Sequence, residues 1–347
     1  MKQRIATPAI LAASLAAMLA GSGCESALTA RALDAYPPPG RMVEVEPGRR
    51  IQIDCRGEGS PTIVFQSGGD VLGSLAWSPV LPDAARTSRA CAYSRAGIMW
   101  SDPDPRPFEP KDVAEDLHAA LAAAGEKAPY VLVGHSRGGL YNLIFAGLYR
   151  DEVAGMVFVD SSHPDQEQAF ADSGLKTGDY VPPGQELALM LRWTGLLRLE
   201  PYPVDPSIGK PVRALYPRSA AGDAREARHR GDTLELAGLY RDLRNLPVIV
   251  LAREPPEMTA AWREEDARNG YLLSADGLAD DDAPPVREGV WRKLQKDIST
   301  WSSRGRLETV PNSNHAFFFN KPEAVLAAVA EVVAAARVTT RPTRPAN

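Results

Sequence analysis

The chain has 347 residues, of which 44% are hydrophobic and 24% charged, so it is long enough to bury a sizeable core. One large domain with an insertion fits this length as well as two domains do. The formal net charge is −5 and no basic cluster stands out, which argues against nucleic acid as a partner.

The N-terminal segment has the layout of a signal peptide. Lys2 and Arg4 precede an apolar run that extends from Ile5 to Ala20, and small residues follow it. The run is shorter than the ~20 residues that a membrane-spanning helix needs. We therefore expect residues 1–23 to be removed during export.

The stretch "LAGSGC" at the end of this segment resembles the processing site of bacterial lipoproteins. The resemblance implies that Cys24 becomes the new N-terminus and carries a lipid, whereas Ala20-Gly21-Ser22 also fits the cleavage site of a freely secreted protein. Residues 24–40 have the composition of a tether. We expect an exported protein, either secreted or held at a membrane by an N-terminal lipid anchor.

Short apolar segments then alternate with helical patterns along the chain. A hairpin is predicted where "RMVEVE" and "RIQIDC" flank a Pro-Gly turn. Further strands are predicted at "TIVFQ", "ACAYS", "YVLVG", "VAGMVFVD", "LPVIVLARE" and "GRLETVP". Because unbroken apolar runs are typical of strands buried on both faces, the pattern predicts an α/β fold with a mostly parallel sheet and an antiparallel edge.

Helices are predicted at "KDVAEDLHAALAAAG", "GGLYNLIFAGLY" and "KPEAVLAAVAEVV". In the first of these, Val113, Leu117 and Leu121 recur at four-residue spacing, and Asp112 and Glu115 are placed to form a capping box. Residues 161–245 are too long for a crossover loop and predict a helical insert. Residues 254–289 predict a polar, acidic loop, and residues 337–347 predict a disordered tail.

The segment "YVLVGHSRGGLYNLIF" places a Gly-x-Ser-x-Gly motif between a predicted strand and a predicted helix. A tight turn in this context strains the serine and exposes its hydroxyl above the sheet, while the glycines let neighbouring backbone pass. Ser136 is therefore the candidate nucleophile. The alternative is an ordinary strand–helix turn that is rich in small residues.

A serine nucleophile needs a base, and His315 is the best candidate among the five histidines. It lies after the last predicted strand and before the last helix, on the side of the sheet where Ser136 emerges. His118 lies on a polar helix face, and His229 lies in a charged stretch of the insert. His135 should point away from the site, and His163 follows the candidate acid too closely to be the base.

The residue that orients the base should end a strand between Ser136 and His315. Asp160 directly ends "GMVFVD", and it is our choice for the triad acid. Glu254 and Glu257 follow the next strand, and Glu257 is the principal alternative. Asp160 could instead act only as a helix cap that opens the insert.

The oxyanion that forms during acyl transfer requires hydrogen-bond donors. The backbone N–H of Arg137, directly after the nucleophile, is one candidate, and the loop "QSGGD" supplies the second, for which we choose Gly69. The alternative for this loop is an ordinary glycine turn. The sequence contains no His/Cys/Asp cluster at metal-ligand spacing, so we expect neither a metal nor another cofactor.

Four motifs between residues 40 and 336 together resemble the α/β-hydrolase superfamily: "QSGG", "AYSRAGIMWSDP", "GHSRGG" and "NSNH" before a Pro-led helix. The resemblance implies a domain over residues 41–336, with an eight-stranded, mostly parallel sheet, helices on both faces and a helical cap at 161–245. It also matches Asp160 to the members whose acid follows the sixth strand. Ser67 replaces the usual histidine of the oxyanion loop, and Ser94 replaces the usual aspartate of the second motif.

Besides Cys24, the sequence contains two cysteines, Cys55 and Cys91. An exported chain permits a disulfide between them, and the alternative is two buried thiols. The sheet order of the superfamily makes the second and fourth strands neighbours, and this resemblance implies that Cys55 and Cys91 form the disulfide.

The sequence thus predicts a serine hydrolase that acts on an ester of a small or medium acyl substrate. Ser136 attacks the carbonyl, His315 transfers the proton, and Asp160 orients His315. An amide or peptide hydrolase, a lactonase and a cofactor-free perhydrolase would use the same triad. A non-catalytic surface binding protein of the same fold is the alternative from another class. The expected partner is a small ester-like molecule.

Overall fold

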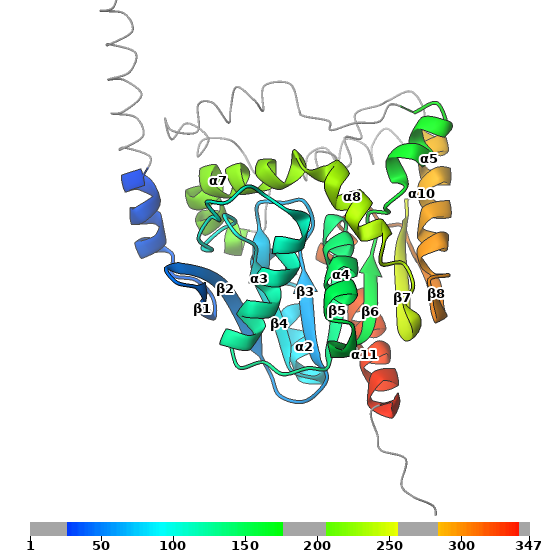
Figure 1. Ribbon diagram of the computed structural model, residues 1–347, viewed down its shortest axis with the longest axis horizontal. Helices are drawn as coiled ribbons and strands as arrows, with labels where there is room; N and C mark the ends of the chain where they lie inside the picture. The colour runs from blue at the N-terminus through cyan, green and yellow to red at the C-terminus, as the bar shows by residue number, and fades with distance from the viewer. Residues whose placement is uncertain (1–25, 176–205, 256–283, 340–347) are drawn as a thin grey trace, which may run out of the picture.

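The computed structural model describes residues 26–175, 206–255 and 284–339, and an eight-stranded sheet lies at its centre (Figure 1). The strand order is β1-β2-β4-β3-β5-β6-β7-β8. The strands are β1 (Arg41–Glu46), β2 (Arg49–Arg56), β3 (Thr62–Gln66), β4 (Ala90–Ser94), β5 (Tyr130–His135), β6 (Val153–Val159), β7 (Arg244–Glu254) and β8 (Ser302–Pro311). The hairpin β1–β2 and the β2–β4 pair are antiparallel, and the other pairs are parallel. The predicted fold class is confirmed.

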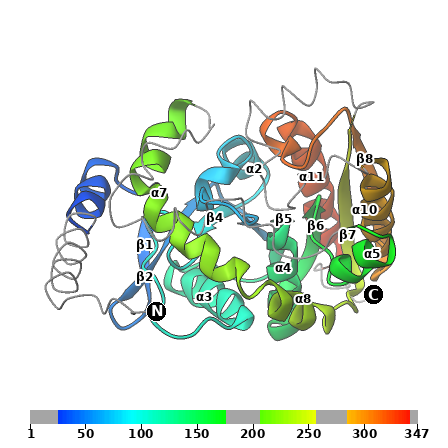
Figure 2. The ribbon, with the colours of Figure 1, turned by 90° about the horizontal axis from the view of Figure 1, so that it is seen from above.

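Helices cover both faces of the sheet (Figures 1 and 2). One face carries α3 (Pro110–Ala123) and α4 (Arg137–Leu148), and the other carries α2 (Leu81–Thr87) and α11 (Pro322–Thr339). The central strand β5 shows why its apolar run is unbroken. Val131 and Val133 belong to the core on the α2–α11 side, whereas Leu132 belongs to the core on the α3–α4 side. Both faces of the strand are therefore buried, as expected for a parallel sheet with helices on each side.

In the described part of the region predicted as a helical insert, three helices follow β6. They are α5 (Gln166–Asp172), α7 (Pro206–Ala227) and α8 (Arg230–Gly238). Viewed from above, α7 crosses over the edge of the sheet near β4, and α5 lies near β7 and α10 (Pro284–Ile298) (Figure 2). The parallel strands end at this edge, so the insert covers the side where we expect the catalytic residues.

Several predicted boundaries differ from the structure. Residues 26–35 of the predicted tether are helical, with Ala32 buried, and the carbonyl O of Tyr36 accepts a hydrogen bond from Trp100 Nε1 at 2.7 Å. Helix α10 begins inside the predicted acidic loop 254–289, and α11 extends into the predicted tail. The capping box of α3 uses Glu109 with Asp112, not Asp112 with Glu115, because the N-cap lies three residues before the predicted one and a proline follows it as the first helical residue.

Cys55 and Cys91 face each other in the antiparallel pairing of β2 with β4, and a disulfide joins them. Their Cα atoms are 4.0 Å apart and 36 positions apart in sequence. The bond therefore fastens the antiparallel edge of the sheet to its parallel part.

Several predictions fall on segments outside the described residues. They are the signal peptide 1–23, Cys24, the stretch "GQELALMLRWTGLLRLEPYPV" of the insert and Glu257. Within the described ranges, no helix combines the length and the apolar character needed to cross a bilayer.

Candidate active site

Ser136 lies between β5 and α4, in the turn that the motif predicted. Its backbone has φ 50° and ψ −126°, a conformation that costs a non-glycine residue free energy and that is typical of functional sites. Arg137 begins α4, where backbone N–H groups lack acceptors within the helix. The nucleophile candidate therefore sits at a strained strand–helix turn beside a helix N-terminus.

The glycines around Ser136 allow close packing of backbone. A Cβ atom on Gly138 would lie 2.5 Å from the carbonyl O of Gln66 and 2.6 Å from that of Ser67. A Cβ atom on Gly134 would lie 2.8 Å from the backbone of Gly138. Since real Cβ contacts are longer, only glycine lets α4 approach the loop that follows β3.

We expect Gly138→Ala to lower stability by about 1–3 kcal/mol, because the new methyl group forces the Gln66–Ser67 backbone away. Urea unfolding measures this loss. Gly231→Ala is the matched control, because a Cβ there meets no atom of the described residues within 4 Å; its site within α8 predicts a small gain. Equal stability of the Gly138 variant and the native protein would contradict the expectation.

Strand register brings Asp160 beside Ser136. The parallel β5–β6 ladder pairs His135 with Val159, so the next residue on each strand is a predicted catalytic residue. Asp160 has φ 43°, and its backbone N–H donates to the carbonyl O of Leu251 on β7 at 2.7 Å. Asp160 thus lies at the end of β6, between the ends of β5 and β7.

His315 lies in a loop that is held at the end of β7. The backbone N–H of Ser313 donates to the Glu254 carbonyl O at 3.1 Å, and the N–H of Glu254 donates to the Ser313 hydroxyl at 3.2 Å. This arrangement places His315 Nδ1 2.6 Å from Asp160 Oδ2. The structure therefore brings together the predicted base and the predicted acid at the edge of the sheet where Ser136 lies.

The prediction that His135 points away from the site is wrong. The His135 ring packs 4.5 Å from the His315 ring, centroid to centroid, and its Nε2 lies 2.9 Å from the His315 carbonyl O. Burial lowers the pKa of His135, and the neighbouring His315 lowers it further, so the ring is neutral and supports the His315 loop. The remaining histidines pair with carboxylates elsewhere: His118 with Glu152, His163 with Asp297 and His229 with Asp232.

Asp160 is fully buried and is surrounded by donors that the sequence analysis did not identify. Arg253 donates from its backbone N–H to Oδ1 at 3.1 Å and from Nη1 to Oδ2 at 2.7 Å, and Trp291 Nε1 donates to Oδ1 at 2.8 Å. Burial alone would raise the pKa of Asp160. The Arg253 charge and the hydrogen bonds from His315 and Trp291 outweigh burial and hold that pKa below its usual range.

The predicted oxyanion loop, which follows β3, lies against the nucleophile turn. A Cβ atom on Gly68 would lie 3.1 Å from Ser136 Cβ, and one on Gly69 would lie 2.5 Å from Arg137 Nη2. Gly68 therefore lies close to the candidate nucleophile, and Gly69 packs against the Arg137 guanidinium. The choice of Gly69 and Arg137 as the two donors stays a prediction.

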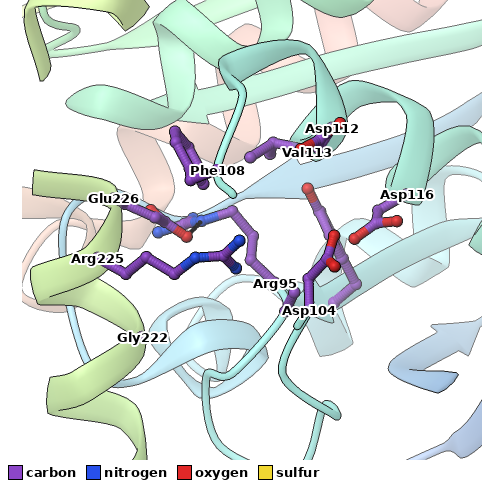
Figure 3. Close-up of a pocket in the computed structure, with 11 residues that line it drawn as sticks. Arg95, Asp104, Phe108, Asp112, Val113, Asp116, Gly222, Arg225 and Glu226 are labelled. Atoms are coloured by element: carbon purple, nitrogen blue, oxygen red, sulfur yellow. Dashed lines mark hydrogen bonds and ion pairs between the residues drawn. The ribbon is translucent and has the colours of Figure 1, made fainter. Parts of the chain in front are cut away.

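A buried cluster of charges connects this loop to the insert. Arg95 donates to the carbonyl oxygens of Ser67 and Gly68, each at 2.7 Å, and to Glu226 of α7 at 2.8 Å. Figure 3 shows Glu226 approaching the Arg95 guanidinium beside a small cavity, whose lining does not include the three candidate catalytic residues. Glu226 also pairs with Arg137 at 3.2 Å. Helix α7 is thus tied through Arg95 to Ser67 and Gly68 of the loop after β3, and directly to the Arg137 side chain.

Ser94, which replaces the aspartate usual in the second motif, connects three segments. Its hydroxyl donates to Gln52 Oε1 at 2.7 Å and accepts from the backbone N–H of Ser74 at 3.1 Å. Its carbonyl O accepts a hydrogen bond from Ser101. The loop near the motif is therefore held by neutral hydrogen bonds around Ser94.

Curated relatives match only part of the chain. The chain is 33% identical over 176 residues to an uncharacterized protein of Schizosaccharomyces pombe, which covers 42% of this chain and 32% of that protein. It is 26% identical over 137 residues to an uncharacterized protein of Bacillus subtilis, covering 39% and 42% respectively. The matched stretches thus span less than half of the length of either relative.

Solved structures resemble the chain over most of its length. A haloalkane dehalogenase loop variant from Bradyrhizobium elkanii has a TM-score of 0.58 at 15% identity, covering 86% of this chain and 97% of that chain. A thermophilic esterase from Thermogutta terrifontis has a TM-score of 0.55 at 18% identity, covering 85% and 98%. At these identities the likeness establishes the shared fold alone.

A family model gives the assignment that the fold and motifs anticipate. The model described as "Alpha/beta hydrolase family" matches residues 63–328, which is well over half of the chain. That range contains the nucleophile turn, the insert and the loop with His315. The chain belongs to the alpha/beta hydrolase family.

Proposed function

We propose that this hydrolase is a serine hydrolase that cleaves an ester of a small or medium acyl group. Ser136 is the nucleophile, His315 the general base and acid, and Asp160 the residue that orients His315. The observation that carries the proposal is the 2.6 Å contact between His315 Nδ1 and Asp160 Oδ2, at the sheet edge where β5 delivers Ser136 in a strained turn.

In the proposed reaction, His315 Nε2 takes the proton of Ser136 Oγ as that oxygen attacks the carbonyl carbon. The backbone N–H groups of Arg137 and Gly69 stabilise the oxyanion. The tetrahedral intermediate collapses as His315 returns the proton to the leaving alkoxide. A water molecule, deprotonated by His315, then releases the acid product from the acyl-enzyme.

The choice of an ester rests on chemistry. A serine nucleophile favours acyl transfer over the reactions of relatives that attack through an aspartate. Among acyl substrates, an ester has a better leaving group than an amide and demands less of the general acid. An amide or peptide hydrolase, a lactonase or a perhydrolase would use the same three residues.

Reaction with a fluorophosphonate probe tests the proposal directly. We expect the folded protein to lose activity as one equivalent of probe attaches to Ser136, because the probe phosphonylates activated serines and releases fluoride. Peptide mapping by mass spectrometry locates the label. Absence of labelling at Ser136 in folded protein would favour a non-catalytic binding protein of this fold.

A panel of p-nitrophenyl esters of increasing chain length then defines the acyl specificity. We expect kcat/KM to be highest for a short or medium chain, and parallel assays with anilides and lactones separate the alternative substrates.

The disulfide between Cys55 and Cys91 also supports our proposal that the protein acts outside the cytoplasm, where disulfides persist.

A further inference from the structure

The end of β7 presents a buried cation to the candidate triad. The Arg253 side chain is 3% exposed, and its Nη1 lies 2.7 Å from Asp160 Oδ2 and 3.2 Å from His315 Nδ1. The backbone N–H of the same residue donates to Asp160 Oδ1 at 3.1 Å. One residue therefore holds both oxygens of the acid and contacts the base.

Helix α10 fixes the other edge of the guanidinium. Glu288 Oε1 accepts from Arg253 Nε at 3.1 Å and from Nη2 at 2.8 Å. The Arg253 guanidinium carbon lies 5.0 Å from the centre of the Trp291 ring, whose Nε1 donates to Asp160. The planar group is thus held by an anion, an aromatic face and the acid itself.

This geometry has an electrostatic consequence for the base. Asp160 Oδ2 accepts hydrogen bonds from both Arg253 Nη1 and His315 Nδ1, so part of its negative charge is already neutralised before His315 gains a proton. The guanidinium charge also repels the imidazolium form at 3.2 Å. Both effects disfavour protonated His315.

We infer, on the basis of the proposed function, that Arg253 is a positioning residue that fixes the Asp160 carboxylate and extends activity toward lower pH by keeping His315 neutral. Glu288 balances this effect because its negative charge partly offsets that of Arg253. His135, which packs against His315, is a further titratable group among the described residues, and its lowered pKa leaves it neutral. Within this part of the chain, Arg253 and Glu288 therefore carry the opposing charges that act on the Asp160–His315 pair.

The test measures kcat/KM for a p-nitrophenyl ester against pH in three variants of the full chain. Arg253→Met keeps an unbranched stem but removes the cation, and should move the acid limb to higher pH by about one unit or more. Arg253→Lys keeps the charge, so its acid limb should stay near that of the native enzyme while kcat falls because the planar, bidentate hold is lost. Glu288→Gln should move the limb the opposite way, to lower pH.

Arg287→Met is the matched control. Arg287 is another buried arginine, but it lies on α10 and packs over the Phe170 ring instead of the triad. Its removal should therefore leave the acid limb within half a pH unit of the native position. If the Arg253→Met protein fails to fold, the other two variants still test the inference. The acid limb of Glu288→Gln should then move to lower pH, and that of Arg253→Lys should stay near the native position.

An unchanged acid limb in folded Arg253→Met, or limbs that move the same way in Arg253→Met and Glu288→Gln, would overturn the inference. Full activity of Ser136→Ala would instead overturn the proposed function, and this inference with it. Loss of activity in Ser136→Ala together with an unmoved acid limb in Arg253→Met would leave the proposed function intact and remove only the role of Arg253.

Discussion

Replacing Ser136 with alanine should lower kcat on p-nitrophenyl esters by about 10⁴- to 10⁶-fold, because no acyl-enzyme can then form. The substitution removes one buried hydroxyl from a turn whose neighbours are held by backbone contacts, so the protein should remain folded. A residual rate above that in water would reflect binding and the oxyanion donors alone. Steady-state kinetics and circular dichroism measure the two effects.

The Ser162→Ala variant provides the matched control. Ser162 is also buried near this turn, and its backbone N–H donates to the Ser136 carbonyl O at 3.0 Å, a bond that alanine retains. Its kcat should stay within a few-fold of the native value. If Ser136→Ala keeps native activity, or if the control loses activity equally, Ser136 is not the nucleophile.

The sequence predicted the sheet well because its signals are local. An apolar run such as Val131–Val133 alternates between two cores, and that burial on both faces appears in the sequence as an unbroken hydrophobic segment. Helix ends were less certain. Helix α7 passes through Pro211 and Pro217, residues that normally argue against a helix interior, so the length of this helix could not be predicted from local preference.

The position of the candidate site followed from topology. Ser136 and Asp160 each come directly after a parallel strand, and neighbouring parallel strands end at the same edge of the sheet. His315 follows the last strand by four residues, in a loop that β7 holds. Chain order and strand ends were therefore sufficient to select three residues that the fold brings to one edge.

The surroundings of the site could not be predicted in this way. Arg253 lies within the strand motif "LARE", where a charged residue normally marks a solvent-exposed strand end, yet it is buried by partners from a helix far along the chain. Of those partners, Glu288 lies within the segment predicted as an acidic loop, 254–289, and Trp291 lies just after it. The orientation of His135 likewise depends on the His315 loop, 180 positions away. Such contacts arise only from the tertiary structure.

Asp160→Asn should lower kcat by about 10⁴-fold, because an amide cannot hold His315 in the required tautomer or stabilise its protonated form. The same change takes one carboxylate partner from the Arg253 cation in a buried site, so stability should also fall by a few kcal/mol. Kinetics must therefore be measured below the unfolding temperature of the variant. Fluorophosphonate labelling of Ser136 should slow in parallel with kcat, since both reactions need the same activated hydroxyl.

Glu257→Gln separates the two acid candidates. Because Asp160 Oδ2 already contacts His315 Nδ1 at 2.6 Å, we expect the Glu257 variant to keep kcat within a few-fold of the native enzyme. A large loss in Glu257→Gln with a mild effect in Asp160→Asn would move the role of the acid to the segment after β7. In that case the Arg253 charge would hold Asp160 as a structural ion pair, and its removal would lower stability without changing the pH profile. The pH profile of the Arg253 variants and the kinetics of the two acid variants are therefore independent tests of Asp160 as the triad acid.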